Sequence, residues 1–299
     1  MKSFCIILLL FISCSEAPKK SVKAELYGVG NLSSELPEFM LTMNKNETKA
    51  YFNRMDKNRV NINLMFSTFE NEQWTEAIYI SLFEKPSRIV DPFLTNDEKY
   101  LFFSSNALQN EDDKKDDYNV WYVEIKDNQY SKPIYAEGIN QPESAEIYTT
   151  LTNENIIAFS SEIRGDKKRD IYLSKFDGKI FTKPERVFIP GTRNQKLGNP
   201  GISPDGNTIV FGANLEVTVG GYDLYYTEKK KDGWSIAKNL GPLVNSEETE
   251  FTPVFSKNGE WLYFTSERAG VVQDISGYDR APGDFYRVRW KDVLEGLTE

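Results

Sequence analysis

Five polar side chains recur along the chain, each just ahead of a short apolar segment: Glu38, Asp91, Glu146, Asn199 and Glu250. If these segments are arranged in a ring, the four carboxylates and the amide would surround its opening. Such a rim could bind a cation or the hydroxyl groups of a sugar. Alternatively, each side chain accepts hydrogen bonds from backbone N–H groups of a neighbouring repeat and has only a structural role.

The sequence contains no histidine. This excludes Ser-His-Asp and Cys-His catalysis as well as histidine zinc sites, so any enzyme chemistry must rely on carboxylates, Tyr, Lys or Arg. The formal net charge is −9, and Lys and Arg are not concentrated in any extended segment. Because phosphate binding needs a concentrated basic face, a nucleic-acid partner is not expected.

Four segments share one pattern, in which a hydroxyl side chain precedes a polar turn and an apolar run. They are LTNDEKYLFFSS (94–105), LTNENIIAFSS (151–161), ISPDGNTIVFGA (202–213) and FSKNGEWLYFTS (255–266), and LTMNKNETKAYFN (41–53) is a looser fifth copy. Their hydroxyl residues Thr42, Thr95, Thr152, Ser203 and Ser256 are separated by 53, 57, 51 and 53 residues. A period of this length indicates repeated supersecondary units.

Two further elements follow each copy. A second strand-like segment covers residues 63–67, 119–123, 170–174, 223–227 and 284–288, and a motif of aromatic, Ser/Thr, any residue and Pro/Ala covers 74–77, 130–133, 181–184 and 234–237. Pro133 and Pro184 restrict this last element to an outer edge strand. Each repeat therefore predicts a four-stranded antiparallel blade, and five repeats predict an all-β, five-bladed β-propeller.

The fifth repeat lacks its outer element. Residues 21–27 (SVKAELY) stand just before the first repeat, where such an element belongs. We expect this N-terminal strand to complete the fifth blade and close the ring, which leaves no long exposed edge. Six blades are the alternative, if residues 104–118 or 268–283 form an irregular blade. The propeller then covers residues 21–290, followed by a C-terminal tail at 291–299.

These motifs resemble the TolB-like (WD-repeat-like) β-propeller family. The resemblance rests on NPGISPDGNTIVFGAN (199–214) with GGYDLYYT (220–227), and on TPVFSKNGEWLYFTSER (252–268). It extends over residues 21–290 and implies a propeller fold and a location in the bacterial cell envelope.

The longest connections, residues 104–118, 213–222 and 265–283, are all expected on one face of the ring. Loops on a rigid scaffold often carry function, so we expect a ligand at this face. The acidic residues from Glu111 to Asp117 could bind calcium, although a solvated loop is the simpler interpretation. A polar residue also recurs at the start of the second strand-like segment, where a scaffold role is expected: Asn63, Asn119, Asp170, Asp223 and Asp284.

The expected inner strands, residues 39–43, 92–96, 149–152, 200–203 and 252–256, contain no carboxylate. Propeller glycosidases would need carboxylates there to act as nucleophile, acid and base. We therefore predict that the chain is not an enzyme and holds no cofactor. The predicted function is binding of an envelope protein or glycan at the loop-rich face. The alternatives are a carbohydrate-active enzyme on a propeller scaffold and a structural subunit of an envelope complex.

The N-terminus carries a processing signal. Lys2 precedes the apolar run FCIILLLFI (4–12), which is too short to cross a hydrocarbon core of about 30 Å and is typical of a signal peptide. The following residues, up to Cys14, resemble a bacterial lipobox. This predicts a signal peptide at 1–13, a lipid on Cys14, a tether at 14–20 and anchoring to the outer membrane, on its periplasmic or surface face. Ordinary cleavage after Ala17 is the alternative.

Substitution of the predicted lipid site tests this interpretation. Cys14→Ala should abolish incorporation of labelled fatty acid and release the protein from the membrane fraction, because a short tether alone has no membrane affinity. Metabolic labelling and membrane fractionation measure both effects. A wild-type protein that takes up no label and has Pro18 as its mature N-terminus would instead establish ordinary cleavage.

Overall fold

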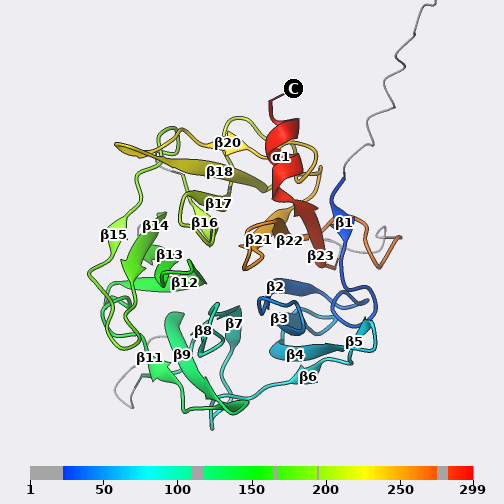
Figure 1. Cartoon of the computed structure of the whole chain (residues 1–299), viewed down its shortest axis with the longest axis vertical. Coiled ribbons are helices and arrows are strands. Elements are labelled where there is room, and N and C mark those ends of the chain that lie inside the picture. Colours follow the sequence, from blue (N-terminus) through cyan, green and yellow to red (C-terminus); the bar gives the residue numbers. More distant parts are fainter. Residues whose placement is uncertain (1–22, 110–116, 164–167, 194, 275–281, 299) are drawn as a thin grey trace, which may run out of the picture.

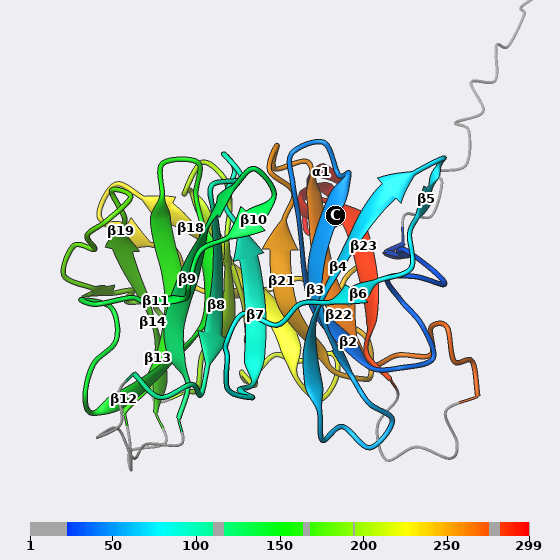
Figure 2. The same cartoon turned by 90° about the horizontal axis from the view of Figure 1, so that it is seen from below.

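The computed structural model describes residues 23–109, 117–163, 168–193, 195–274 and 282–298. Its strands form five antiparallel sheets around a central axis, in chain order, so that the last sheet adjoins the first (Figures 1 and 2). The prediction of an all-β, five-bladed propeller is confirmed, and the six-bladed alternative is wrong. Cys14 and residues 110–116 of the predicted calcium loop lie outside the described residues.

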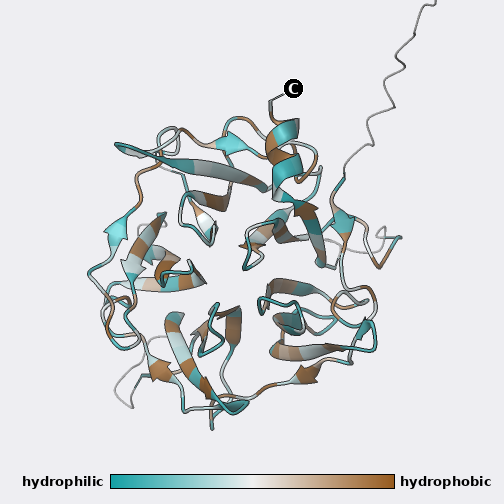
Figure 3. Ribbon diagram, in the orientation of Figure 1, coloured by the Kyte–Doolittle hydropathy of each residue, from teal (hydrophilic) through white to brown (hydrophobic). Residues whose placement is uncertain are grey.

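The three inner strands of each blade are long and largely buried, and apolar segments recur on them (Figure 3). The first strands, next to the axis, are β2 (Glu38–Met43), β7 (Ile89–Leu94), β12 (Ser144–Leu151), β16 (Gly198–Ile202) and β21 (Glu250–Phe255). The second are β3 (Lys49–Met55), β8 (Tyr100–Ser105), β13 (Ile156–Ile163), β17 (Thr208–Ala213) and β22 (Trp261–Ser266). The third are β4 (Ile62–Glu70), β9 (Asn119–Lys126), β14 (Arg169–Lys175), β18 (Asp223–Lys230) and β23 (Asp284–Arg289). Blades lie against both faces of these strands, which is why their apolar runs do not alternate.

The repeated hydroxyl residue closes the hairpin between the first two strands. Ser203 Oγ donates to Asp205 (2.5 Å) and accepts from the Thr208 backbone N–H (2.9 Å). In the first blade the corresponding residue is Asn44, whose Oδ1 accepts from the backbone N–H groups of the turn. The sequence alignment placed Thr42 there, two residues early, because a search for Ser or Thr passes over an amide that makes equivalent hydrogen bonds.

The outer edge of the blade is broken into short pieces. These are β5 (Gln73–Trp74) and β6 (Ile78–Tyr79), β10 (Gln129–Tyr130) and β11 (Ile134–Tyr135), β15 (Glu185–Arg186), and β19 (Gly233–Trp234) and β20 (Lys238–Asn239). The Ser or Thr of the third motif lies at the break. In the first blade, Thr75 N donates to Thr68 O (2.8 Å) while Thr75 Oγ1 accepts from Thr68 N (3.1 Å). The hydroxyl thus replaces a backbone acceptor where the strand departs from the ladder.

The N-terminal segment completes the fifth blade, as the sequence predicts. Strand β1 (Glu25–Leu26) pairs antiparallel with β23. The Tyr27 N–H extends the ladder by donating to Phe285 O (2.8 Å), and the Tyr27 ring packs edge-on against Tyr263 with centroids 5.1 Å apart. The first and last strands of the described chain therefore lie in one sheet (Figure 1).

The chain continues beyond β23 into a helix where the sequence pattern predicts only a tail. Helix α1 (Trp290–Gly296) buries Val293 completely, and its Trp290 ring lies edge-on to Tyr226 and Phe255. It covers the join between the fourth and fifth blades. Within the described part of the chain, no helix has the length and apolar character needed to span a membrane.

Ring closure can be tested by truncation. A variant beginning at Gly28 lacks β1 and Tyr27, so it should melt roughly 5 °C or more below one beginning at Ser15, because β23 becomes an unpaired edge and Tyr263 loses its aromatic neighbour. Thermal melting followed by circular dichroism measures the difference. Equal melting temperatures and equal solubility would show that β1 does not stabilise the ring.

Candidate functional site

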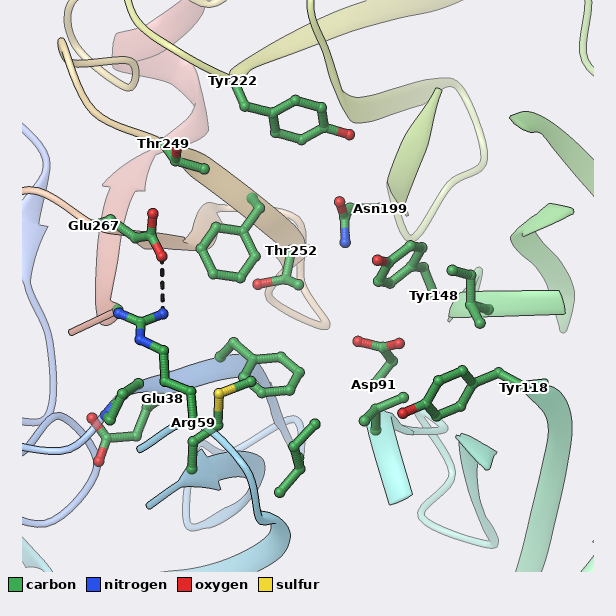
Figure 4. A pocket seen from close by; sticks show the side chains of 18 of the residues that line it. Glu38, Arg59, Asp91, Tyr118, Tyr148, Asn199, Tyr222, Thr249, Thr252 and Glu267 are labelled. Carbon is green, nitrogen blue, oxygen red and sulfur yellow. Dashed lines mark hydrogen bonds and ion pairs between the residues drawn. The ribbon is translucent and has the colours of Figure 1, made fainter. Parts of the chain in front are cut away.

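A pocket of about 560 Å³ opens at one end of the propeller axis. Its walls come from the starts of the first strands, from the connections leading into them, and from the loops between second and third strands (Figure 4). These are the connections that the sequence assigns to one loop-rich face. The pocket is therefore built from segments far apart in the chain.

Each first strand contains a β-bulge, and each bulge contains a non-glycine residue with positive φ. These residues are Met40 (55°), Asp91 (57°), Tyr148 (61°), Asn199 (52°) and Thr252 (47°). The register of each strand pair shifts at this point. Side chains adopt this conformation only where surrounding structure imposes it. All of the five except Met40 line the pocket, so the bulge is the backbone feature that places side chains in the site.

Asp91 is the carboxylate that the pocket leaves unpaired. Its side chain is 1% exposed, and its Oδ1 has no hydrogen-bond partner in the structure. Asn53, on the neighbouring blade, fixes the bulge: its Oδ1 accepts from Asp91 N (2.8 Å), and its Nδ2 donates to Ile89 O (2.8 Å). Figure 4 shows the Asp91 carboxyl directed into the pocket beside Tyr118 and Tyr148.

The environment of Asp91 favours its neutral form. Burial raises the pKa of Asp91 to about 7, and the Tyr148 backbone N–H and the Arg169 charge only partly offset this. A carboxylic acid with this pKa can donate a proton near neutral pH, which is what a general acid requires.

The other predicted rim carboxylates have different surroundings. Glu38, Glu146 and Glu250 lie two residues before the bulge positions, and each accepts from a backbone N–H of the connection ahead of its own strand and from a nearby serine hydroxyl. Glu38 also pairs with Arg54 (2.6 Å) and Glu250 with Arg268 (3.0 Å). Of the five predicted rim residues, the pocket brings together Glu38, Asp91 and Asn199, whereas Glu146 and Glu250 do not line it.

A second carboxylate faces the pocket from the opposite wall. Glu267, in the loop after β22, forms an ion pair with Arg59, in the loop after β3 (3.2 Å; Figure 4). This pair crosses the boundary between the fifth and first blades. A further ion pair, between Arg169 and Glu162 (2.7 Å), lies at the third blade. The pocket is therefore lined by two acids, Asp91 and Glu38, whose pKa values burial raises to about 7, and by Glu267, which is ion-paired with Arg59.

Aromatic side chains supply much of the remaining surface. Phe39 and Phe251 come together from adjacent blades with ring centroids 6.5 Å apart. Tyr118, Tyr148 and Tyr222 line the other walls. Flat apolar rings next to hydroxyl and carboxyl groups match the alternating C–H and O–H surfaces of a sugar.

The polar residues repeated at the third strands organise this face rather than lining the pocket. Asp223 accepts from the backbone N–H groups of Val219 (2.6 Å) and Gly220 (3.0 Å), and Asp284 accepts from Val271 N (2.9 Å). They shape the loops that carry pocket residues. For the predicted calcium site, the described residues contain no cluster of three His, Cys, Asp or Glu side chains able to hold a metal.

The statement that the inner strands lack carboxylates is wrong. Strands β2, β12 and β21 include Glu38, Glu146 and Glu250, and β7 includes Asp91. The strands begin one to five residues earlier than the apolar runs suggest, because a bulge just ahead of the run or near its start interrupts the strand pattern. A polar residue at the bulge looks like a loop residue in the sequence, yet it belongs to the strand.

Other pocket residues escaped the sequence analysis for two reasons. Tyr148 occupies the same bulge position as Asp91 and Asn199, four residues before the repeated hydroxyl, and a stricter repeat alignment would have found it. Arg59 and Glu267 lie in loops outside the repeat pattern, where no sequence signal marks them.

Comparisons with known proteins agree on the fold. No protein-family profile and no curated protein match the sequence, so the resemblance to TolB-like propellers is not confirmed. Among solved structures, an α-L-arabinofuranosidase from Lactobacillus brevis matches with a TM-score of 0.56 at 12% identity, covering 86% of this chain and 92% of the other. A GH43 endo-arabinanase from Bacillus licheniformis matches with a TM-score of 0.50 at 10% identity, covering 87% and 96%. At these identities the likeness shows a shared propeller fold.

The prediction that the chain is not an enzyme is overturned. Both matched proteins are enzymes, and the shared fold extends over 92% and 96% of their chains. The argument against catalysis depended on inner strands without carboxylates, and the structure removes that premise.

The burial of Asp91 predicts a pH-dependent stability difference. The carboxyl keeps its proton up to about pH 7 when folded and loses it near its ordinary value of 3.8 when unfolded. Its stabilising contribution is therefore complete below pH 3.8 and lost as pH rises through 7. Asp91→Asn should melt close to wild type at pH 4 and roughly 5 °C or more above it at pH 8. Asp127→Asn, at an exposed position, serves as the control. A melting-temperature difference between Asp91→Asn and wild type that is the same at pH 4 and pH 8 would contradict the burial argument.

Proposed function

We propose that the protein is a carbohydrate-active enzyme that hydrolyses a glycosidic bond in the axial pocket, with Asp91 as the general acid. The observation that carries this proposal is a buried carboxyl with one unpaired oxygen and a pKa raised to about 7, in a pocket lined by aromatic rings. The likeness to an arabinofuranosidase and an endo-arabinanase supports it, because this scaffold serves glycoside cleavage in both.

The two carboxyl groups have different roles in the proposed reaction. Asp91 donates its proton to the glycosidic oxygen as the bond to the anomeric carbon breaks. Glu267, paired with Arg59, orients a water molecule and takes its proton as that water attacks the anomeric carbon. The aromatic walls hold the sugar ring, and Asn53 acts as a positioning residue through the Asp91 bulge.

The lipid anchor at Cys14 remains part of this proposal. It would hold the propeller at the membrane of the cell envelope, where glycans are at hand. The short segment between Cys14 and β1 would leave the propeller close to the surface that anchors it.

The leaving group of the substrate tests the role of Asp91. Asp91→Asn should lower kcat on an arabino-oligosaccharide about 10²–10⁴-fold, because the sugar leaving group needs a proton. The same variant should retain most activity on p-nitrophenyl α-L-arabinofuranoside, whose nitrophenolate leaves without one. Wild-type activity on the oligosaccharide should fall as pH rises through about 7, as Asp91 loses its proton.

A matched control lies on the same blade. Asp97→Asn makes the same chemical change in the β7–β8 hairpin, away from the pocket, and Asn258 makes the equivalent hydrogen bond in the fifth blade. It should leave both activities unchanged. Absence of turnover by wild type across arabinosides, xylosides and galactosides from pH 4 to 9 would overturn the proposed function.

A further inference from the structure

The pocket is walled on every side. Each of the five blades contributes a side chain from the loop after its second strand or from the start of its third strand: Arg59, Tyr118, Arg169, Tyr222 and Glu267. Figure 4 shows Arg59, Tyr118, Tyr222 and Glu267 on different sides of the pocket. An extended polymer lying across the face would have to pass through this wall. A chain entering end-on would not.

The axis below the pocket is filled with apolar side chains. Met40, Phe93, Leu151 and Val254 belong to one buried cluster, although they come from four different blades. None of them lines the pocket, whereas four of the five bulge residues do. The bulges therefore mark the depth to which a ligand can enter.

The far end of the axis is sealed by a lysine. Lys257, in the β21–β22 hairpin of the fifth blade, donates to Leu94 O of the second blade and lies over the Phe93 ring, 3.8 Å from its centroid. These two blades do not adjoin, so the side chain crosses the axis. The small cavity beside Lys257, about 10 Å³, shares no lining residue with the pocket. The pocket is thus closed at its inner end.

The charges around the opening are already paired. Arg59 is held by Glu267, and Arg169 by Glu162, which also lies 3.7 Å from Lys196. A sugar carboxylate would have to displace one of these partners and would approach Asp91. A neutral sugar can use the aromatic rings and hydroxyl groups without breaking an ion pair.

We propose that the pocket binds the terminal sugar of a glycan chain, that this sugar is neutral, and that the enzyme removes sugars from a chain end. This inference rests on the proposed function. Closure at the bulges and at Lys257 prevents a chain from threading through, and the five-sided wall prevents it from lying across.

Chain-end recognition can be measured without turnover. Three arabinopentaoses serve as probes. One carries a naphthylmethyl ether on its non-reducing terminal sugar, one carries the same group on its reducing terminal sugar, and the third is unmodified. Binding to Asp91→Asn of the mature protein is followed by isothermal titration calorimetry. One of the two modified chains should bind at least tenfold more weakly than the unmodified chain and the other within about twofold. Equal affinity of all three chains would overturn chain-end recognition.

Products of the wild-type enzyme separate this inference from the proposed function. Linear arabinan should release monosaccharide while the viscosity of the solution stays nearly constant. From a chain that ends in a uronic acid, the terminal sugar should be released at least tenfold more slowly. Early loss of viscosity with oligosaccharide products would overturn the chain-end inference and leave glycoside hydrolysis standing. Absence of both binding and hydrolysis across the panel would overturn the two together.

Discussion

The pairing of β1 with β23 is the constraint on which the rest of the structure depends. It joins the first and last strands of the described chain in one sheet and makes the first and fifth blades neighbours. The same boundary is crossed near the axis by Met40 N, which donates to Thr252 Oγ1 (3.2 Å), and at the pocket by the Arg59–Glu267 ion pair. Ring closure and assembly of the pocket therefore depend on the same boundary between the first and fifth blades, and an open ring would have no complete pocket.

The bulge in each first strand has the same backbone conformation in every blade but a different side chain. Its backbone conformation repeats in all five blades, while the side chain at the bulge changes from Met to Asp, Tyr, Asn and Thr. Two residues earlier, three blades carry a glutamate that ties the preceding connection to the strand. A carboxylate two residues before the bulge position thus has several hydrogen-bond partners, whereas the carboxylate at the bulge position, Asp91, has one unpaired oxygen.

Hydrogen-bond and ion-pair partners distinguish Asp91 from the other buried acids of the first strands. Removing an ionised carboxylate from water is costly unless a cation or several donors compensate for the lost hydration. Arg268 pairs with Glu250, and Arg54 pairs with Glu38, although burial still raises the pKa of Glu38 to about 7. Asp91 lacks such a partner at hydrogen-bond distance, so its pKa rises and it keeps a proton. A buried carboxyl without a cation partner does not favour folding, and exceptions of this kind are expected at functional sites.

The sequence by itself determined the period, the blade count and the closing strand, because hairpin turns, strand hydrophobicity and edge prolines are local properties that repeat every 51 to 57 residues. It also identified the loop-rich face and Asp91. It could not show where the first strands begin, because a bulge interrupts the pattern of strand residues. Nor could it distinguish Asp91 from Glu38, Glu146 and Glu250. That distinction depends on which partners reach each carboxylate from other segments and other blades, and only the tertiary structure decides it.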